Sequence, residues 1–458
     1  MPPTSPTPVN RDEATARAPS PGAVRDAVRA RSDACPGALR LHAADDGALA
    51  RLRLPAGVLT HRQAQVLADA AERLGDGHLD LTSRGNVQLR GLDAGCGGEL
   101  AALLHGADLL PSEAHERVRN IVASPLAGLD GLGAGDVQLW ARRLDELLCA
   151  SDAATGLSGR FLFALDDGRG DVAALGADVT LLARRDGTVT VRTGANHPAV
   201  RVPDVRVPDV RVPAADAPRA ALLAAEVFLT VAGASGTGAW RVQDLPAESA
   251  RGLTAAVTER LTAAGIPVLP GDAGSDAAAP GPAPTPAPTP APGPIPSPDG
   301  TVALSAYPRL GRLSVAQWRL LLTEDRGLRL TPWRGVIVPG LAPAAAAGLL
   351  GHLRTAGLVT DPGSPWLGVG ACTGRPGCAK ALADVRADAA AAVAEAAAPG
   401  VDGNGLPVYW SGCARRCGRP RGDHVDRVAT GEGRYTVSVH RHDNGPNADN
   451  ADNAAVTR

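Results

Sequence analysis

Lysine is almost absent from this chain: Lys380 is its one lysine, and arginine supplies the other basic residues. Aromatic residues make up only 3%, and the formal net charge is −2 over 458 residues. A balance this close to neutral argues against a nucleic-acid partner or an acidic membrane surface. The length allows two or more domains.

Long apolar runs are lacking as well. No run approaches the ~20 residues of a membrane-spanning helix, and the N-terminus lacks the charged-then-apolar pattern of a signal peptide. Seven cysteines are an odd, low number for this length, unlike a secreted disulfide framework. The sequence therefore predicts a cytoplasmic protein with no membrane partner.

Four of the cysteines form the most informative pattern in the chain. Cys372 and Cys378 lie in Gly368–Arg386, and Cys413 and Cys417 lie in Tyr409–Pro420. Thiolates in a C-x5-C…C-x3-C set suit an iron–sulfur cluster or zinc, although the x5 spacing is wide for zinc. Buried thiols or disulfides remain the alternative. The alanine-rich run from Ala379 predicts a helix whose positive end faces the cluster, with Lys380 near enough to screen its charge.

A β-α-β order occurs twice. In the first copy, a strand at Gly47–Leu54 precedes the capping box Thr60–Gln63, a helix and an alternating strand at His78–Arg90. The second copy has a capping box at Ser314–Gln317, and the stretch from Thr331 to Gly340 repeats the spacing of Thr82 to Gly91. We therefore expect an internal duplication, with a site between the halves.

The remaining segments complete the expected organisation. Helices are predicted at Ser112–Val122 and Asp136–Leu148, and low-complexity repeats at 200–214 predict a surface insertion. The predicted boundaries are a disordered N-terminus at 1–31, a first half-domain at 32–100, a first large domain at 101–270, a Pro/Ala linker at 271–299, a second half-domain at 300–362, a cluster domain at 363–440 and a disordered tail at 441–458.

The strand at His78–Arg90 carries a polar face. Arg84, Asn86, Gln88 and Arg90 alternate, so they point to one side of a continuous strand. A solvated strand face is the simpler interpretation. The other is a pocket for a polyanionic ligand, because guanidinium groups pair with carboxylates.

The two cysteine segments, with Thr82–Arg90, resemble the sirohaem-type sulfite/nitrite reductase superfamily. The amino-acid sequences of the cysteine segments are most similar to its precorrin-3B synthase branch. The resemblance covers roughly Ala34–Val439. It implies an α+β fold of duplicated ferredoxin-like half-domains plus two cluster- and tetrapyrrole-binding domains in pseudo-twofold order. It also implies a [4Fe-4S] cluster on the four cysteines, and pocket roles for Arg84, Asn86, Gln88, Arg90, Arg119 and Arg160. Leu162 stands where the reductases carry a basic residue, which weakens the small-oxyanion site.

The branch resembled is an oxidoreductase of aerobic cobalamin biosynthesis, a monooxygenase. It uses O2 to hydroxylate precorrin-3A at C20 with γ-lactone formation. The resemblance implies a separate mononuclear iron, for which His42, His115, His197 and His424 are loose candidates, each also interpretable as a surface or structural histidine. No nucleotide or flavin motif is present, so an external donor, ferredoxin-like or an NADH-linked reductase, is expected.

Two other functions stay open. One is a sirohaem-dependent, ferredoxin-linked sulfite or nitrite reductase, a haem-binding enzyme in which Cys417 would bridge to the sirohaem iron. The other is a non-enzymatic iron–sulfur or tetrapyrrole carrier. The catalytic residues are not assigned, and Cys35, Cys96 and Cys149 are interpreted as structural.

Overall fold

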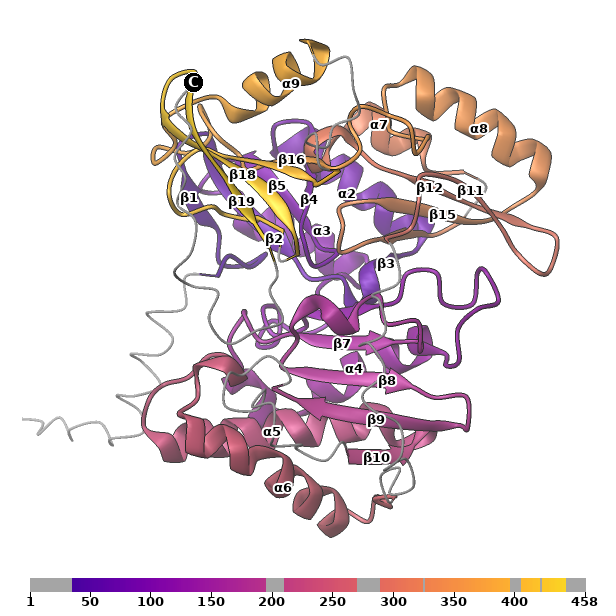
Figure 1. Cartoon of the computed structure of the whole chain (residues 1–458), viewed down its shortest axis with the longest axis vertical. Coiled ribbons are helices and arrows are strands. Elements are labelled where there is room, and N and C mark those ends of the chain that lie inside the picture. The colour runs from indigo at the N-terminus through magenta and orange to yellow at the C-terminus, as the bar shows by residue number, and fades with distance from the viewer. Residues whose placement is uncertain are drawn as a thin grey trace, which may run out of the picture. The chain divides into compact units, whose positions relative to one another are not determined.

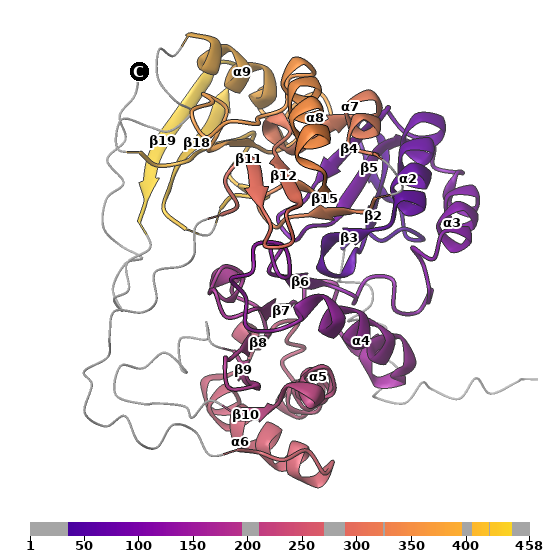
Figure 2. The same cartoon turned by 90° about the vertical axis from the view of Figure 1, so that its right-hand side faces the viewer.

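The computed structural model describes residues 35–194, 210–269, 289–323, 326–395, 405–420 and 422–441, all within one compact unit, Cys35–Arg458. The predicted N-terminal segment 1–31 lies outside these residues, as do 200–209 of the insertion predicted at 200–214, 271–288 of the linker predicted at 271–299, 442–458 of the tail predicted at 441–458, and His197. Four sheets, two antiparallel and two mixed, with helices against them make an α+β fold. Figures 1 and 2 show the sheets of both half-domains beside the C-terminal sheet.

The first half-domain has the strand and helix order β-β-β-α-β-β-α, and its first helix is capped at the N-terminus. Its elements are β1 (His42–Ala44), β2 (Gly47–Leu52), η1 (Pro55–Gly57), β3 (Val58–Leu59), α2 (His61–Leu74), β4 (His78–Leu81), β5 (Val87–Leu92) and α3 (Gly97–Gly106). The predicted capping box is confirmed: Thr60 accepts from the Gln63 backbone N–H, and the Gln63 side chain accepts from that of Thr60. The alternating stretch at His78–Arg90 is not one strand, because a turn separates β4 from β5.

The second half-domain repeats this order with a shorter helix. Its elements are β11 (Gly293–Pro296), β12 (Val302–Ala306), η6 (Arg309–Gly311), β13 (Arg312–Ser314), α7 (Val315–Leu320), β14 (Leu328–Leu330), β15 (Val336–Leu341) and α8 (Pro343–Thr355). Ser314 and Gln317 form the second capping box as predicted. Strand β11 pairs with β12 inside the segment predicted as a linker, so the C-terminal part of that linker is sheet.

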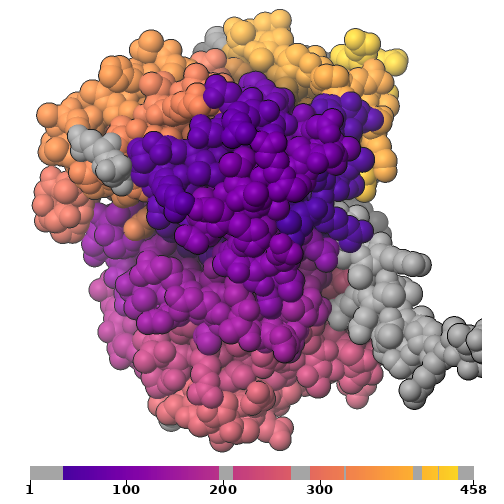
Figure 3. Space-filling view, turned by 180° about the vertical axis from the view of Figure 1, so that it is seen from behind, coloured from indigo at the N-terminus to yellow at the C-terminus, as the bar shows by residue number. Residues whose placement is uncertain are grey.

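The two half-domains exchange edge strands. Strand β13 pairs with β4 of the first half, and β3 pairs with β14 of the second. The Trp318 indole N–H donates to the Ala64 carbonyl at 2.8 Å, between α7 and α2. Both halves contribute to one apolar core, and Figure 3 shows their surfaces side by side. This exchange fixes the half-domains against each other.

The third sheet has the order β10-β9-β8-β7-β6. Its strands are β6 (Ile121–Ala123), β7 (Phe163–Asp166), β8 (Val179–Ala183), β9 (Thr188–Thr193) and the edge strand β10 (Val210–Pro213), with helices α4 (Val137–Ala150), α5 (Ala217–Ser235) and α6 (Ala247–Ala263) and the short η2 (Asp152–Gly156), η3 (Ala173–Leu175), η4 (Ala214–Asp216) and η5 (Val242–Asp244). The helix predicted at Asp136–Leu148 is confirmed as α4, which Asp136 caps. The helix predicted at Ser112–Val122 is wrong: turns lead there into β6.

Helix α5 is the apolar centre of this sheet's core. Ala214–Ser235 is long and apolar enough to cross a membrane by length and composition, but 61% of its apolar window is buried inside the protein. Phe228 of α5 packs against Phe161, with ring centroids 5.0 Å apart. Both features are those of a core helix.

The fourth sheet carries the cysteine segments. It has the order β16-β17-β18-β19, made of β16 (Val369–Ala371), β17 (Val408–Ser411), β18 (His424–Gly431) and β19 (Arg434–His440). Cys372 and Cys413 follow the ends of β16 and β17, which are parallel neighbours, so both cysteine loops leave the same edge. Helix α9 (Val385–Glu395) begins at Val385 rather than at Ala379 as predicted.

Candidate functional site: an arginine-lined cavity beside the cysteine loops

A cavity of about 460 Å³ lies where the half-domains, the third sheet and the cysteine loops meet. Cys372 and Cys417 border it on one side. Its other walls carry six arginines and one acid, Asp80. The arginines are Arg51, Arg53, Arg84, Arg160, Arg334 and Arg386. Such a wall attracts an anion with several charges.

Several of these guanidinium groups have buried N–H donors without partners among the described residues. They are Arg51 Nε, Arg53 Nη1, and Arg386 Nε and Nη1. An unsatisfied buried donor costs about 1–3 kcal/mol, and more when it is charged. A ligand that accepts from these groups would recover that free energy.

Arg53 is the most strongly affected member of the wall. It is 4% exposed, and burial, with Arg51 and Arg84 nearby, lowers its pKa to about 9. Burial also lowers the pKa of Arg51. Like charges are thus held together in a site whose one described acid, Asp80, is paired with Arg386 at 2.8 Å.

Sequence analysis missed Arg51 and Arg53, although the strand at Gly47–Leu54 carried the signal. The two alternate with Leu52 and Leu54, so they share a face, the same pattern that drew attention to Arg84–Arg90. Arg334 and Arg386 come from other parts of the chain and had no such signal.

Arg84, Asn86 and Gln88 line the cavity, and their role in ligand binding stays a prediction. Arg84 lies in the turn between β4 and β5 rather than in a strand. Its guanidinium donates to the carbonyls of Gly159 at 3.3 Å and Arg160 at 2.9 Å. Asn86 accepts from the Leu54 N–H at 2.8 Å, and Gln88 accepts from Arg51 at 2.9 Å. These contacts join the first half-domain to the third sheet and orient the wall.

Arg90 and Arg119 differ from their predicted positions. Neither lines the cavity. Arg90 makes a two-point ion pair with Asp46, at 2.8 and 2.7 Å, and donates to the Gly377 carbonyl at 2.7 Å. Arg119 pairs in the same way with Asp145, at 2.6 Å for each contact. Carboxylates distant in sequence thus form ion pairs with both guanidinium groups. Arg90 also hydrogen-bonds the loop that precedes Cys378.

Arg160 and Leu162 differ sharply. Arg160 lines the cavity and its guanidinium lies over the Trp240 ring, 4.4 Å from the centroid. Leu162 is 3% exposed and belongs to a small apolar cluster with Val122 and Ala164. The position where reductases of the resembled superfamily are expected to hold a basic group is therefore part of the core.

The two cysteine loops are joined by backbone contacts. The Cys372 N–H donates to the Trp410 carbonyl at 2.9 Å, and the Leu382 N–H donates to the Gly412 carbonyl at 2.8 Å. The Gly412 N–H donates to Cys372 Sγ at 3.1 Å. A Cβ on Gly412 would lie 2.7 Å from the Ala381 Cβ, so only glycine allows this approach.

The four cysteines do not form a compact single-ion site in the described residues: no three of their sulfurs are among the groups of ligand atoms within 4.8 Å of one another. A four-iron cube spaces its ligands more widely than one zinc ion does. The cluster on these cysteines therefore stays a prediction. Burial raises the pKa of the Cys372 thiol, and a bound metal would offset that cost because it would ligate the thiolate.

The second cysteine loop is fixed from both sides. Arg334 donates to the Gly418 carbonyl at 2.7 Å, and the Tyr409 hydroxyl donates to the Cys417 carbonyl at 2.7 Å. The Arg334 guanidinium lies 5.8 Å from the Tyr409 ring centroid. Lys380 is exposed in a turn before α9 rather than within a helix.

The remaining cysteines and histidines lie in varied settings. Cys35 borders the cavity, whereas Cys96 and Cys149 do not. His42 is in β1, and His115 contacts Ser112 Oγ at 2.7 Å and the Ser151 carbonyl at 3.0 Å, which is a structural arrangement. Of the predicted iron candidates, His424 has further possible ligands beside it, Asp426 and His440.

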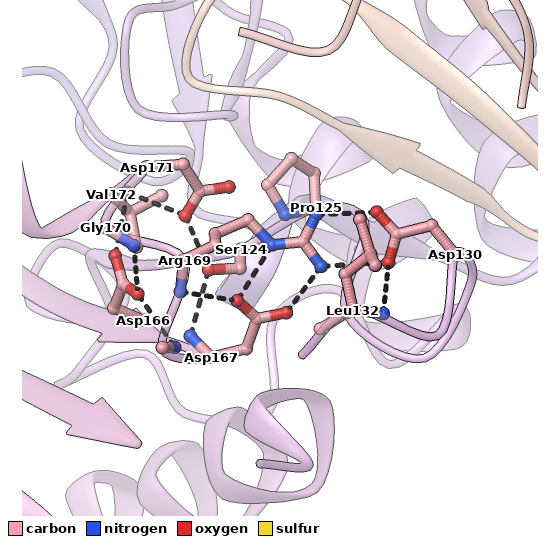
Figure 4. Close-up of polar contacts among 12 residues, drawn as sticks. Ser124, Pro125, Asp130, Leu132, Asp166, Asp167, Arg169, Gly170, Asp171 and Val172 are labelled. Carbon is pink, nitrogen blue, oxygen red and sulfur yellow. Dashed lines mark hydrogen bonds and ion pairs between the residues drawn. The ribbon is translucent and has the colours of Figure 1, made fainter. Parts of the chain in front are cut away.

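A second acidic group, Asp166, Asp167 and Asp171, follows β7 (Figure 4). Asp166 accepts from four backbone N–H groups, and Asp167 pairs with Arg169 at 2.8 and 2.7 Å. Asp171 accepts from Ser124 Oγ, and burial raises its pKa to about 6. These carboxylates already have donors, so the group is a structural network that shapes a loop.

The chain is similar to sulfite and nitrite reductases in its fold and in part of its sequence. Residues 42–105 match the family described as "Nitrite/Sulfite reductase ferredoxin-like half domain". The solved structure of the Mycobacterium tuberculosis NirA protein shares the fold, with a TM-score of 0.68 at 19% identity over 86% of this chain and 77% of that one.

More particularly, the chain is similar over most of its length to a precorrin-3B synthase of Sinorhizobium sp., with 28% identity over 421 residues, 91% of this chain and 84% of that protein. A ferredoxin–nitrite reductase of Synechococcus elongatus is 27% identical over 400 residues, 81% of this chain and 74% of the relative. The resemblance inferred from the cysteine segments is confirmed.

Proposed function

We propose that this chain is a monooxygenase of the precorrin-3B synthase type, with a [4Fe-4S] cluster on Cys372, Cys378, Cys413 and Cys417. The observation that carries the proposal is the group of buried N–H donors on Arg51, Arg53 and Arg386 that have no partner among the described residues, in a cavity beside two of those cysteines. The substrate would be precorrin-3A, a metal-free tetrapyrrole. Its many carboxylates match the donors.

Four arginines of the cavity have proposed roles. Arg51, Arg53 and Arg386 would bind acetate and propionate carboxylates. Arg84 would hold the wall between the first half-domain and the third sheet, because two of its N–H groups donate to carbonyls there. The cavity volume falls within the ~300–1,000 Å³ typical of ligand sites. A macrocycle seated there would have one face toward Cys372 and Cys417.

The reaction would incorporate one oxygen atom of O2 at C20 of the ring, with γ-lactone closure from an acetate side chain. The other oxygen atom is reduced to water, and this reduction consumes two electrons and two protons. The cluster would supply electrons when bound, and an external donor, a ferredoxin-like protein or an NADH-linked reductase, would replace them. Cytoplasmic location stays a prediction.

The surroundings of Leu162 favour this function over a sirohaem-dependent reductase. A small oxyanion needs several basic groups around it, and a lost charged hydrogen bond costs about 1.5–3 kcal/mol. Here Leu162 is in the core and Arg119 is paired with Asp145. Sirohaem with Cys417 as bridge remains the second candidate, supported by the similarity to nitrite reductases. A non-enzymatic carrier is the third.

One experiment separates the three. The protein is purified without oxygen, its visible spectrum is recorded, and it is mixed with precorrin-3A, a chemical reductant and isotopically labelled O2. We expect a broad absorbance of an iron–sulfur cluster and a product that carries about one labelled oxygen atom by mass spectrometry. Sharp sirohaem bands with sulfite or nitrite turnover would favour the reductase, and tetrapyrrole binding without turnover of any of these would favour the carrier.

A further inference from the structure

A second cluster of possible ligands lies on the last hairpin of the described chain, β18–β19 (yellow in Figures 1 and 2). The antiparallel register places His424 opposite His440. Asp426 follows His424 by two residues on the same strand, so the two share a face. Two imidazoles and one carboxylate therefore meet at one side of the hairpin.

The distances are those of a compact group. His424 Nε2 lies 3.5 Å from Asp426 Oδ1, and His440 Nε2 lies 3.2 Å from Asp426 Oδ2. The two imidazole rings are stacked, with centroids 4.9 Å apart and planes at 15°. One ligand atom from each residue lies within 4.8 Å of the others.

Burial makes this arrangement costly as it stands. Asp426 is fully buried and His424 is 3% exposed. Among the described residues, no hydrogen bond of good geometry reaches either Asp426 oxygen, His424 Nε2 or His440 Nε2. Polar groups removed from water without such bonds are destabilising.

The tautomer of His424 adds to the argument. Its Nδ1 lies 2.6 Å from the Gly422 carbonyl oxygen. A carbonyl oxygen can only accept a hydrogen bond, so Nδ1 carries the proton and donates it. A bound cation would take the place of a proton on Nε2, and the Nε2 lone pair would then face that cation beside the carboxylate. Metal-binding histidines are commonly oriented in this way, with the other nitrogen bonded to a backbone carbonyl.

Two arginines also approach the carboxylate. Arg416 Nε lies 2.9 Å and Arg419 Nη1 3.8 Å from Asp426 Oδ2. Both contacts are to Oδ2, which leaves Oδ1 toward His424. Arg416 precedes Cys417, and Asp426 is the register partner of Tyr409 on β17. The group therefore lies one strand from a side chain of the cavity and against the second cysteine loop.

We propose that His424, Asp426 and His440 bind a divalent first-row transition metal, with Fe(II) the best match. Two histidines and one carboxylate that leave further coordination positions open are the ligand set of non-haem Fe(II) sites. The two Nε2 atoms and the Asp426 carboxylate would hold the metal, and Arg416 would stay paired with Oδ2. The inference depends on this hairpin alone, so it stands whether or not precorrin-3A is the substrate.

Sequence analysis considered His424 alone. The signal for the others was His-x-Asp on a strand, followed after a tight turn by a strand that ends in histidine. The register that brings His440 opposite His424 needs the hairpin geometry, which the sequence leaves open because Glu432-Gly433 allows more than one pairing.

The test is the balance of iron and sulfide. The full chain is reconstituted under argon with Fe(II) and sulfide, desalted, and its iron and acid-labile sulfide are measured. A [4Fe-4S] cluster contributes both equally, so a separate iron appears as an excess of about one iron per chain. We expect this excess in the wild type and in the control His352→Ala, an exposed histidine of α8, and its loss in His440→Ala and Asp426→Asn with sulfide unchanged.

A second readout covers the case in which a variant also loses sulfide. Nitric oxide added to Fe(II)-loaded wild type should give the EPR signal of a high-spin iron–nitrosyl complex, which His440→Ala should lack. His440 has a side chain that is 39% exposed, so its removal leaves the core intact. A wild type without excess iron, or an excess and a nitrosyl signal that survive in both variants, would overturn the proposal.

Discussion

Replacing Arg53 should stabilise the ligand-free protein and weaken ligand binding. Arg53 is buried, its pKa is lowered to about 9 from 12.5 by burial and by Arg51 and Arg84, and its Nη1 has no partner among the described residues. The folded state then holds the proton less tightly than the unfolded state. The resulting loss of stability is complete below about pH 9 and is relieved only as the pH rises above it.

The magnitude follows from the shift. At about 1.4 kcal/mol per pKa unit, the charge on Arg53 costs about 5 kcal/mol as an upper limit, and the high effective dielectric constant of a protein interior reduces this to about 2 kcal/mol. Arg53→Met removes the charge and keeps the length. It deletes one hydrogen bond, from Nε to the Arg117 carbonyl at 3.3 Å, but that carbonyl also accepts from Asn120 at 3.0 Å. We expect a net stabilisation of about 1–2 kcal/mol.

The assay is urea unfolding at pH 7.5 with and without uroporphyrin, a metal-free tetrapyrrole rich in carboxylates. A ligand at 100 times its Kd should stabilise the wild type by about 2.7 kcal/mol, and the gain should fall by at least half in Arg53→Met. Arg251→Met, at an exposed position of α6, is the matched control and should change neither quantity. A variant less stable than the wild type, with uroporphyrin affinity unchanged, would refute the reasoning.

Three further predictions follow from single contacts. Arg90→Met should lower the sulfide content of the purified protein without changing uroporphyrin affinity, because Arg90 holds the Gly377 carbonyl and does not line the cavity; an unchanged cluster would contradict this role. Gly412→Ala should prevent cluster assembly, since its Cβ would lie 2.7 Å from that of Ala381, and a brown, fully loaded variant would show that the loops do not need this approach. Asp171 has a pKa raised to about 6, so the folded state binds its proton more tightly than the unfolded state, and wild-type stability should fall as pH rises from about 4 to 6. In urea unfolding, Asp171→Asn should flatten this pH dependence and be about 1–2 kcal/mol more stable than the wild type at pH 7.5. An unaltered pH profile would count against this prediction.

Local patterns carried most of what the sequence could predict. Both capping boxes formed because their bonds span only three residues, and α4 began at its Asp136 cap. The helix expected at Ser112–Val122 failed for lack of such a signal. His115 is held there by Ser112 and Ser151, which favours turns over a helix.

The candidate site was only partly predictable for a different reason. A period of two placed Asn86 and Gln88 on the cavity wall, but Gly85 has a φ of +65° and turns the chain at Arg84. Arg90 met Asp46 and Arg119 met Asp145, and nothing in a strand or helix pattern indicates which acid an arginine will reach. Tertiary contacts decide which guanidinium groups stay available to a ligand.

The central claim is that one cluster on the four cysteines lies beside a cavity that binds a carboxylated tetrapyrrole. It is tested most directly by the EPR spectrum of the chemically reduced protein during a uroporphyrin titration. The account predicts a reduced-cluster signal whose g values shift on saturation in the wild type, with at least a several-fold higher midpoint in Arg53→Met. A cluster signal that uroporphyrin leaves unchanged while it binds, or a reduced protein with no cluster signal at all, would contradict it.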